Sequence, residues 1–216
     1  MYLGPKIDEA LDKKRDKILG YNTPFYITSV LDRVFKKQDI PVTFKFERFN
    51  DYYKNEYGIG GIYDSNNDQC FIVLHFSKHK KFYMSKNKWA KFKFLVSQAC
   101  QHELIHKSQN QFRQGSLDNE PIDLRSLHRD EIEDEQDYLS YMDEIDAYAH
   151  DIAMEICKFY PDSDPYHILR TINRRKKIDS YNYYCDVFEN EDWSHIRKLL
   201  LKKTYKWLPH VTYTKG

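Results

Sequence analysis

The feature that most constrains this chain is a helical pattern that runs into residues 102–106, HELIH. Apolar side chains recur three and four residues apart from Ser85 onward, which predicts one amphipathic helix with Ser85 or Asn87 as its N-cap. The apolar positions are Trp89, Phe92, Leu95, Val96 and Ala99. On the helical wheel, Glu103 falls near the centre of this stripe and both histidines fall on its flank. The motif is therefore expected to face the protein interior.

Residues 102–106 carry the side chains that a metal site needs. His102 and His106 are four residues apart, so a helix places both imidazoles on one face, within reach of one metal ion. Glu103 between them can accept a proton from metal-bound water. Three ionisable groups on a buried face are costly unless they bind an ion or pair fully. We expect Zn²⁺ at this motif, with Glu103 as the catalytic base; a chance match and a site that has lost its metal are the alternatives.

A catalytic zinc ion needs a third protein ligand and one position left for water. The continuation HExxHxxGxxH is excluded, because Gln109 and Phe112 stand where it requires Gly and His. The downstream candidates are His128, His150 and Glu144.

The pattern downstream favours Glu144 among these. Residues 137–159 have the periodicity of one long helix. Its apolar stripe consists of Tyr138, Tyr141, Ile145, Tyr148, Ala149, Ile152, Ile156 and Phe159. Glu144 borders this stripe, whereas His150 falls about 150° from its centre and is predicted to be a surface histidine, paired with Asp146. His128 lies in a polar connection without periodicity. Glu144 is the preferred metal ligand, with His128 and a purely structural ion pair of Glu144 as alternatives.

The same predicted helix offers supporting side chains. Tyr141 and Tyr148 lie beside Glu144 and could donate to a developing oxyanion, and we assign the catalytic role to Tyr148. Asp151 follows Glu144 by two turns and could orient a ligand histidine through its second ring nitrogen. Packing with a satisfied hydroxyl is the alternative for both tyrosines.

Taken together, the two helices resemble the zincin-type metallopeptidases that use a glutamate as third ligand. Their signature is HExxH followed by ExxA on the next helix, and Glu144 with Ala147 matches the second part. The resemblance covers about residues 70–160 and extends to uncharacterised metallopeptidase-like proteins of bacteria and their large phages. It implies cleavage of peptide bonds by a metal-activated water. The thermolysin-like variant has Asp four residues after the glutamate, where this chain has Tyr148.

A small sheet is predicted before the motif helix. Residues 42–47 alternate apolar and polar side chains, as a half-buried strand does. Gly58, Gly60 and Gly61 predict a turn, and residues 70–76, CFIVLHF, predict a buried strand. His75 within it is interpreted as a sheet histidine with satisfied hydrogen bonds. The resemblance implies that this last strand is the edge lining the cleft, where an extended peptide could add.

The expected fold is α+β and zincin-like, mainly helical, with a small N-terminal sheet packed on the HExxH helix. A length of 216 residues agrees with one domain. Its expected parts are N-terminal helices in 1–40 (6–19 and 25–38), the sheet and metal-binding helices in 41–160, and a helical part in 161–216 (helices near 164–177 and 192–207). Residues 113–136 are expected to form a polar connection.

Composition narrows the choice of partners. Lys plus Arg (34) and Asp plus Glu (33) nearly cancel, which gives no global indication of nucleic acid or membrane binding. The basic patches 78–81 and 174–177 are ordinarily solvated surface. No leader-like or membrane-spanning stretch is found, so we expect a cytoplasmic protein, or one of the host cytoplasm or virion if viral. The four cysteines lack C-x-x-C spacing and are expected to be reduced.

The sequence thus predicts a zinc metallopeptidase that acts on a protein or peptide, without membrane association and with nucleic acid as an unlikely partner. Two alternatives belong to other classes. One is a non-catalytic structural or assembly protein on the same scaffold, in which the metal supports folding. The other is a nucleic-acid-associated protease similar to DNA–protein crosslink proteases, whose third ligand is usually a histidine.

Overall fold

The computed structural model describes residues 3–49, 56–113, 131–188 and 193–211. The chain divides into two compact units, Met1–Asn110 and Gln111–Gly216. The protein is mostly helical with a small sheet, which confirms the predicted α+β class. The zincin-like assignment and the grouping into one domain stay predictions. No helix in these ranges is both long and apolar enough to cross a membrane.

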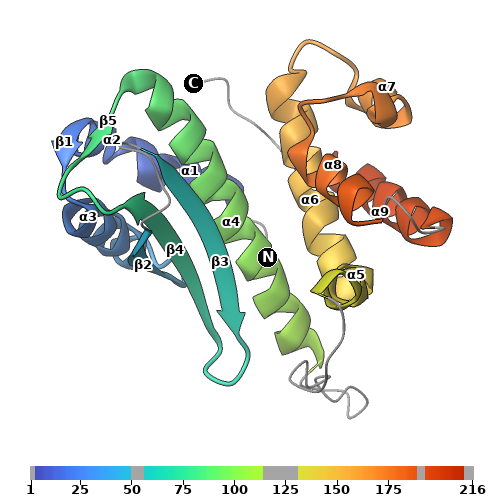
Figure 1. Ribbon diagram of the computed structural model, residues 1–216, viewed down its shortest axis with the longest axis horizontal. Helices are drawn as coiled ribbons and strands as arrows, with labels where there is room; N and C mark the ends of the chain where they lie inside the picture. Colours follow the sequence, from blue (N-terminus) through green and yellow to red (C-terminus); the bar gives the residue numbers. More distant parts are fainter. Residues whose placement is uncertain (1–2, 50–55, 114–130, 189–192, 212–216) are drawn as a thin grey trace. The chain divides into compact units, whose positions relative to one another are not determined.

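The first unit combines helices with two small sheets (Figure 1). Its elements are α1 (Gly4–Asp12), α2 (Arg15–Ile18), β1 (Gly20–Asn22), α3 (Pro24–Lys37), β2 (Val42–Phe49), β3 (Tyr57–Asp64), β4 (Gln69–Ser77), β5 (Phe82–Met84) and α4 (Lys86–Arg113). The helix predicted at 25–38 is α3, and Thr23 caps it by accepting from the Tyr26 amide at 3.1 Å. The helix predicted at 6–19 is instead divided between α1 and α2.

The main sheet has the strand order β2-β4-β3, so β4 is its central strand. β4 is parallel to β2 and antiparallel to β3. The expectation that residues 70–76 form the edge lining a cleft is therefore wrong, and the edges among the described strands are β2 and β3. A continuous apolar run is typical of a strand whose two faces are both covered, and it does not distinguish an edge strand from a central one. The predicted turn at Gly58, Gly60 and Gly61 is also wrong, because all three lie within β3.

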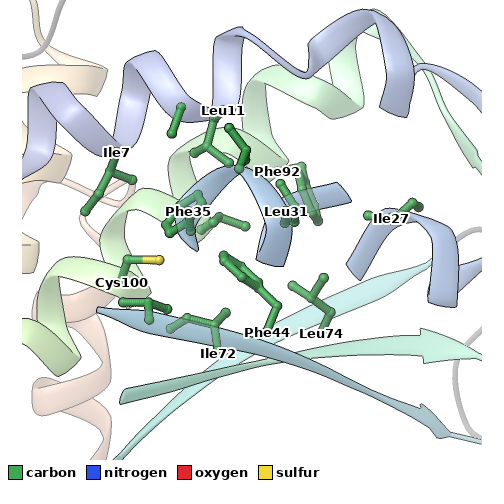
Figure 2. Close-up of a cluster of buried hydrophobic side chains, with 14 of the residues drawn as sticks. Ile7, Leu11, Ile27, Leu31, Phe35, Phe44, Ile72, Leu74, Phe92 and Cys100 are labelled. Carbon is green, nitrogen blue, oxygen red and sulfur yellow. The ribbon is translucent and has the colours of Figure 1, made fainter. Parts of the chain in front are cut away.

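One face of the sheet carries the core of this unit (Figure 2). Alternate residues of β2 and β4 point to it, as the period of a strand dictates. They are Val42, Phe44, Cys70, Ile72, Leu74 and Phe76, and all are buried. The same cluster includes Ile7 and Leu11 of α1, Leu31 and Phe35 of α3, and Phe92 and Cys100 of α4. The three helices thus cover a single sheet face, and α4 is held by its predicted apolar stripe.

The second unit is helical. Its elements are α5 (Glu131–Ser140), α6 (Met142–Phe159), α7 (Pro165–Arg170), the 3-10 helix η1 (Ile172–Arg174), α8 (Asp179–Val187) and α9 (Ser194–Trp207). The predicted helix 192–207 is α9, and the one predicted at 164–177 ends early, at α7. The single helix predicted at 137–159 is wrong, because Tyr141 has an extended backbone (φ −65°, ψ 139°) and separates α5 from α6. The helical spacing of apolar residues continues across Tyr141, so the sequence pattern does not reveal that the helix is interrupted there.

α6 is buried on the side that its sequence pattern assigned to solvent. His150 is fully buried, and its ring packs edge-on against Trp207 of α9 with centroids 5.1 Å apart. Asp146 does not pair with His150; it accepts from Trp207 Nε1 at 3.2 Å and pairs with Lys203 at 3.1 Å. The prediction of a surface histidine is therefore wrong, because α9 covers this face.

All four cysteines are free thiols, as predicted. Cys70 and Cys100 are buried in the first unit, whereas Cys157 and Cys185 are half-buried in the second. Burial raises the pKa of Cys70 to about 12, with a further contribution from the nearby Glu103 carboxylate. These thiols stay protonated and serve as packing groups.

Candidate metal centre

Helix α4 presents the motif as the wheel predicts. Its N-terminus is capped by Ser85, whose Oγ accepts from the Lys88 amide at 3.2 Å. His102 and His106 are half-buried, with ring centroids 4.8 Å apart and planes at 71°. Glu103 is buried, with 6% of its surface exposed. The two imidazoles therefore lie together on one flank of the helix, with the carboxyl group on its buried side.

Gln109 orients the ring of His106. The Oε1 atom of Gln109 lies 3.0 Å from His106 Nδ1. An amide oxygen only accepts hydrogen bonds, so Nδ1 is the donor in this contact and Nε2 is the nitrogen that a neutral ring could offer to a metal. Metal-binding histidines are commonly held in this way through their second nitrogen. In the sequence, Gln109 served only to exclude one motif, although its spacing of three from His106 is the signal for this contact.

Strand β3 passes next to Glu103 at a glycine. A Cβ atom on Gly61 would lie 2.2 Å from Glu103 Oε1 and 2.7 Å from its Cδ. At Gly60 the corresponding atom would lie 3.3 Å from His75 Nε2, a far looser contact. From β4, the Cys70 thiol donates to the backbone oxygen of Glu103 at 3.4 Å. Glycine in this strand thus permits the backbone to approach the predicted catalytic base closely.

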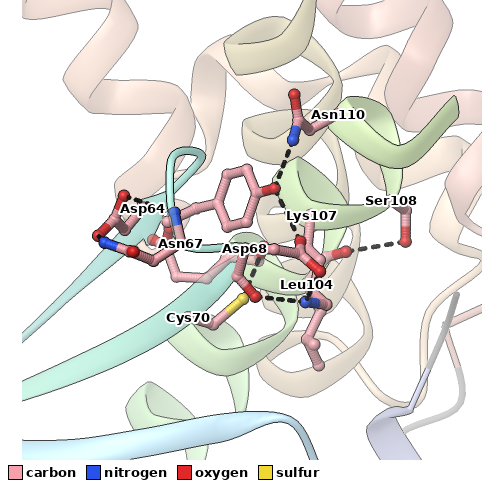
Figure 3. Close-up of polar contacts among 10 residues, drawn as sticks. Asp64, Asn67, Asp68, Cys70, Leu104, Lys107, Ser108 and Asn110 are labelled. Carbon is pink, nitrogen blue, oxygen red and sulfur yellow. Dashed lines mark hydrogen bonds and ion pairs between the residues drawn. The ribbon is translucent and has the colours of Figure 1, made fainter. Parts of the chain in front are cut away.

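The β3–β4 hairpin is attached to α4 just beyond the motif (Figure 3). Lys107 Nζ donates to the backbone oxygen of Asp68 at 2.5 Å and pairs with its carboxylate at 2.6 Å. Tyr63 donates to the Asp68 carboxylate at 3.0 Å, and the Asn110 amide donates to the Tyr63 hydroxyl at 2.7 Å. These contacts, together with the core, set the position of β3 along the helix and hence of Gly61 against Glu103.

His75 lies in β4, as predicted for a sheet histidine. Its Nδ1 is 3.6 Å from a carboxylate oxygen of Glu47 on β2, and its ring packs edge-on against Phe49 at 4.9 Å. Nδ1 is buried without a hydrogen-bond partner among the described residues, so the expectation of satisfied hydrogen bonds is wrong, although the location in a strand is confirmed.

In the second unit, Glu144 and Tyr148 lie one turn apart on α6. Glu144 is in the first turn and buried, with 7% exposure. Tyr148 packs against Tyr183 and Tyr184 of α8, with ring centroids 5.9 and 5.3 Å away. Burial raises the pKa of Tyr148 far above its usual value, and the charges of Tyr183, Asp151 and Glu144 add to the shift. Its hydroxyl therefore stays protonated and able to donate.

Sequence reasoning did not find the two tyrosines of α8. Tyr183 donates its hydroxyl to the Glu135 carboxylate of α5, and Tyr184 donates to the Leu139 backbone oxygen at 3.0 Å. Burial, followed by the bond to Glu135, raises the pKa of Tyr183. No spacing rule links α8 to α6, so only the fold places these rings beside Tyr148.

The other residues that the sequence analysis proposed for the site lie as follows. Asp151 is buried, with its carboxylate 3.5 Å from His150 Nδ1. Tyr141 is half-buried at the N-cap position of α6. His128 lies outside the described residues. His102, Glu103 and His106 belong to the first unit, and Glu144 and Tyr148 to the second.

Comparison with known proteins adds no relative. No protein family, no curated protein and no solved structure matches this chain. The likeness to glutamate zincins consequently rests on the two short motifs alone.

Proposed function

We propose that this protein is a metal-dependent hydrolase, in the first place a zinc metallopeptidase. The observation that carries the proposal is the arrangement on α4, where two imidazoles share a flank and Glu103 lies between them on the buried side. A surface pair of histidines would need neither the buried carboxyl group nor the contact that holds His106 through Nδ1.

The donor set fits a divalent ion of zinc type. The proposed ligands are His102, His106 and Glu144, and each offers one ligand atom to a metal ion. Two imidazole nitrogens and one carboxylate oxygen suit Zn²⁺ and leave a coordination position for water or substrate. When bound, the ion would lower the pKa of a water molecule and polarise a carbonyl group.

The chain's own residues would perform the proton transfers. Glu103 would accept a proton from the attacking water and return it to the leaving amine. Its carboxyl group is confined on one side by the backbone at Gly61. Tyr148, whose raised pKa keeps it protonated, would donate to the oxygen on which negative charge develops.

The edge strand β3 supports a peptide as substrate. It is hydrogen-bonded to β4 on one side, and it is an edge strand of the described sheet. An extended peptide could add to this edge through main-chain hydrogen bonds. Because Gly61 of the same strand adjoins Glu103, an added peptide would run close to the proposed base.

Metal analysis and a cleavage assay on the purified full chain test this function. We expect about one zinc per chain and slow cleavage of unfolded casein. Glu103→Gln should retain the metal and lower turnover by about 10²–10⁴-fold, the usual contribution of a general base. Full activity in Glu103→Gln would contradict the role of this residue. Stoichiometric zinc with no cleavage of any protein would instead favour the non-catalytic scaffold.

A further inference from the structure

The short ribbon formed by β1 and β5 has one buried and one aromatic face. Tyr21 and Tyr83 are directly opposite in the antiparallel register, with ring centroids 4.8 Å apart. Tyr21 is 67% exposed and Tyr83 is 40% exposed, whereas Phe82 and Met84 point the other way and are buried. The core thus anchors the ribbon and leaves two neighbouring aromatic rings in solvent.

Further aromatic rings follow close behind β1. Phe25 and Tyr26 lie in the first turn of α3, within four residues of the ribbon, and are 68% and 41% exposed. Exposed large apolar groups that gather in one region commonly mark a binding surface. Three of these four rings carry a hydroxyl group, so the surface is aromatic and can form hydrogen bonds with water.

The segments that lead into and out of the ribbon are strongly basic. Residues 78–88, which contain β5, hold five lysines and no acidic residue. Residues 13–17, just before β1, hold four basic residues and one acidic residue. Lys78, Lys80 and Lys81 are exposed and immediately precede β5. The near-zero charge of the whole chain therefore conceals a concentrated positive region.

We propose that this surface, defined by Tyr21, Phe25, Tyr26, Tyr83 and Lys78–Lys81, binds single-stranded nucleic acid. Aromatic rings offer stacking platforms to unpaired bases, and lysines contact the phosphates between them. A duplex hides its base faces by stacking, so the exposed rings would have no base to stack on. Surfaces that enter an anionic membrane are rich in Trp, Phe and Leu, and only Phe25 of the four exposed rings here is of that kind.

The surface is separate from the HExxH motif. Both are attached to α4, which begins two residues after β5 at Lys86. Glu103 lies 17 residues further along, about 25 Å at 1.5 Å per residue. Binding of a nucleic acid at the ribbon would therefore leave the proposed base accessible, and the inference does not depend on the hydrolytic function.

Fluorescence anisotropy with the full chain tests the proposal. The probes are a labelled oligothymidylate and a labelled duplex of equal length. We expect tighter binding of the single strand. The double variant Tyr21→Leu/Tyr83→Leu should weaken it by roughly tenfold or more, because leucine keeps the bulk and loses the stacking face. Tyr21→Phe/Tyr83→Phe should bind like the parent. The triple variant Lys78→Ala/Lys80→Ala/Lys81→Ala should lower the log–log salt slope by about 2.

A matched control lies in the second unit. Tyr205 is 58% exposed and packs on Tyr166 with centroids 4.9 Å apart, close to the geometry of the ribbon pair. Tyr205→Leu should leave the affinity unchanged. An equal loss in Tyr205→Leu, equal affinity for duplex and single strand, or no binding at all would overturn the proposal. Full binding of the oligonucleotide by Tyr21→Leu/Tyr83→Leu would also overturn it. If this variant still binds phosphatidylserine vesicles, the surface is a membrane-binding surface instead. Circular dichroism confirms that each variant is folded.

Discussion

Gly61 has a hydrogen atom where any other residue would have a carbon 2.2 Å from the Glu103 carboxylate. Real carbon atoms do not approach that closely, so either the strand or the carboxyl group would have to move. The spacing of Gly61 with Gly58 and Gly60 predicts a turn. In the fold Gly61 is the position at which an edge strand meets the proposed base.

Gly61→Ala should displace the Glu103 side chain while His102 and His106 stay in place. We expect metal content close to that of the parent, hydrolysis reduced as in Glu103→Gln, and a loss of about 1–3 kcal/mol in stability from overpacking. Gly60→Ala is the control, because its Cβ would meet only the end of the His75 ring at 3.3 Å. Zinc analysis, casein cleavage and urea unfolding provide the three measurements.

A double-mutant cycle separates this geometry from the proposed activity. In a Glu103→Ala background the obstruction is gone, so Gly61→Ala should cost less than about 0.5 kcal/mol. Equal destabilisation in both backgrounds would show that Gly61 does not act through Glu103. The cycle gives an answer even if the protein hydrolyses nothing.

Among the secondary-structure elements, α4 carries the HExxH motif and is fixed by two sets of contacts. Its apolar stripe packs on the core face of the sheet, and the β3–β4 hairpin bonds to the turns after His106 (Figure 3). The helix alone would place the histidines but not the strand beside them. The hairpin contacts determine where β3 crosses the helix.

Lys107→Met should loosen the hairpin. The change removes the two contacts with Asp68 and keeps the length of the side chain. We expect a loss of about 1 kcal/mol, since the Asp68 carboxylate is partly solvated. Lys91→Met, at an exposed position of the same helix, should change stability by less than about 0.5 kcal/mol. Thermal unfolding measures both, and equal stability of the two variants would contradict the role of the hairpin contacts.

Burial of His150 between α6 and α9 is also testable. A surface histidine tolerates truncation, whereas a fully buried ring packed on Trp207 leaves a cavity. His150→Ala should therefore cost about 2–4 kcal/mol. His167→Ala, on α7, should cost much less, because that side chain is not among the buried ones. Urea unfolding measures the loss. A loss below about 0.5 kcal/mol, which is usual for surface positions, would contradict the burial of His150.

At the scale of the whole molecule, the proposed ligands come from both compact units. Glu144→Ala should sharply reduce zinc content, while Asp143→Asn, the neighbour that pairs with Arg113, should retain it. Unchanged zinc in Glu144→Ala would return attention to His128. Mass spectrometry of metal content after dialysis distinguishes these outcomes.

Removal of the metal should also lower stability of the whole chain. A ligand present at 100 times its dissociation constant stabilises the folded state by about 2.7 kcal/mol. For a chain of this size, a chelator should lower Tm by roughly 5–10 °C. Re-addition of Zn²⁺ should restore it, whereas the double variant His102→Ala/His106→Ala should not respond to either treatment.

Features that depend on near neighbours in the chain can be predicted from the sequence. The stripe of α4, the alternation in β2 and the burial of Glu103 follow from spacings of two, three and four residues, and Ser85 is one of the two cap residues that the sequence predicts for α4. These patterns are local, because each helix or strand has its own period. The coarse α+β class and the free cysteines were predicted on the same basis.

The surface that packs against each helix or strand depends on long-range contacts, which local patterns do not specify. The apolar run of β4 is compatible with an edge or a centre, and pairing on both sides made it central. The glycines predict a turn, but they lie in β3, where Gly61 adjoins Glu103. The helical pattern predicts that His150 is exposed, but α9 covers it. Such outcomes depend on residues far apart in the chain. The periodicity of apolar residues shows which face of a helix or strand is buried. Long-range packing determines which other element covers that face.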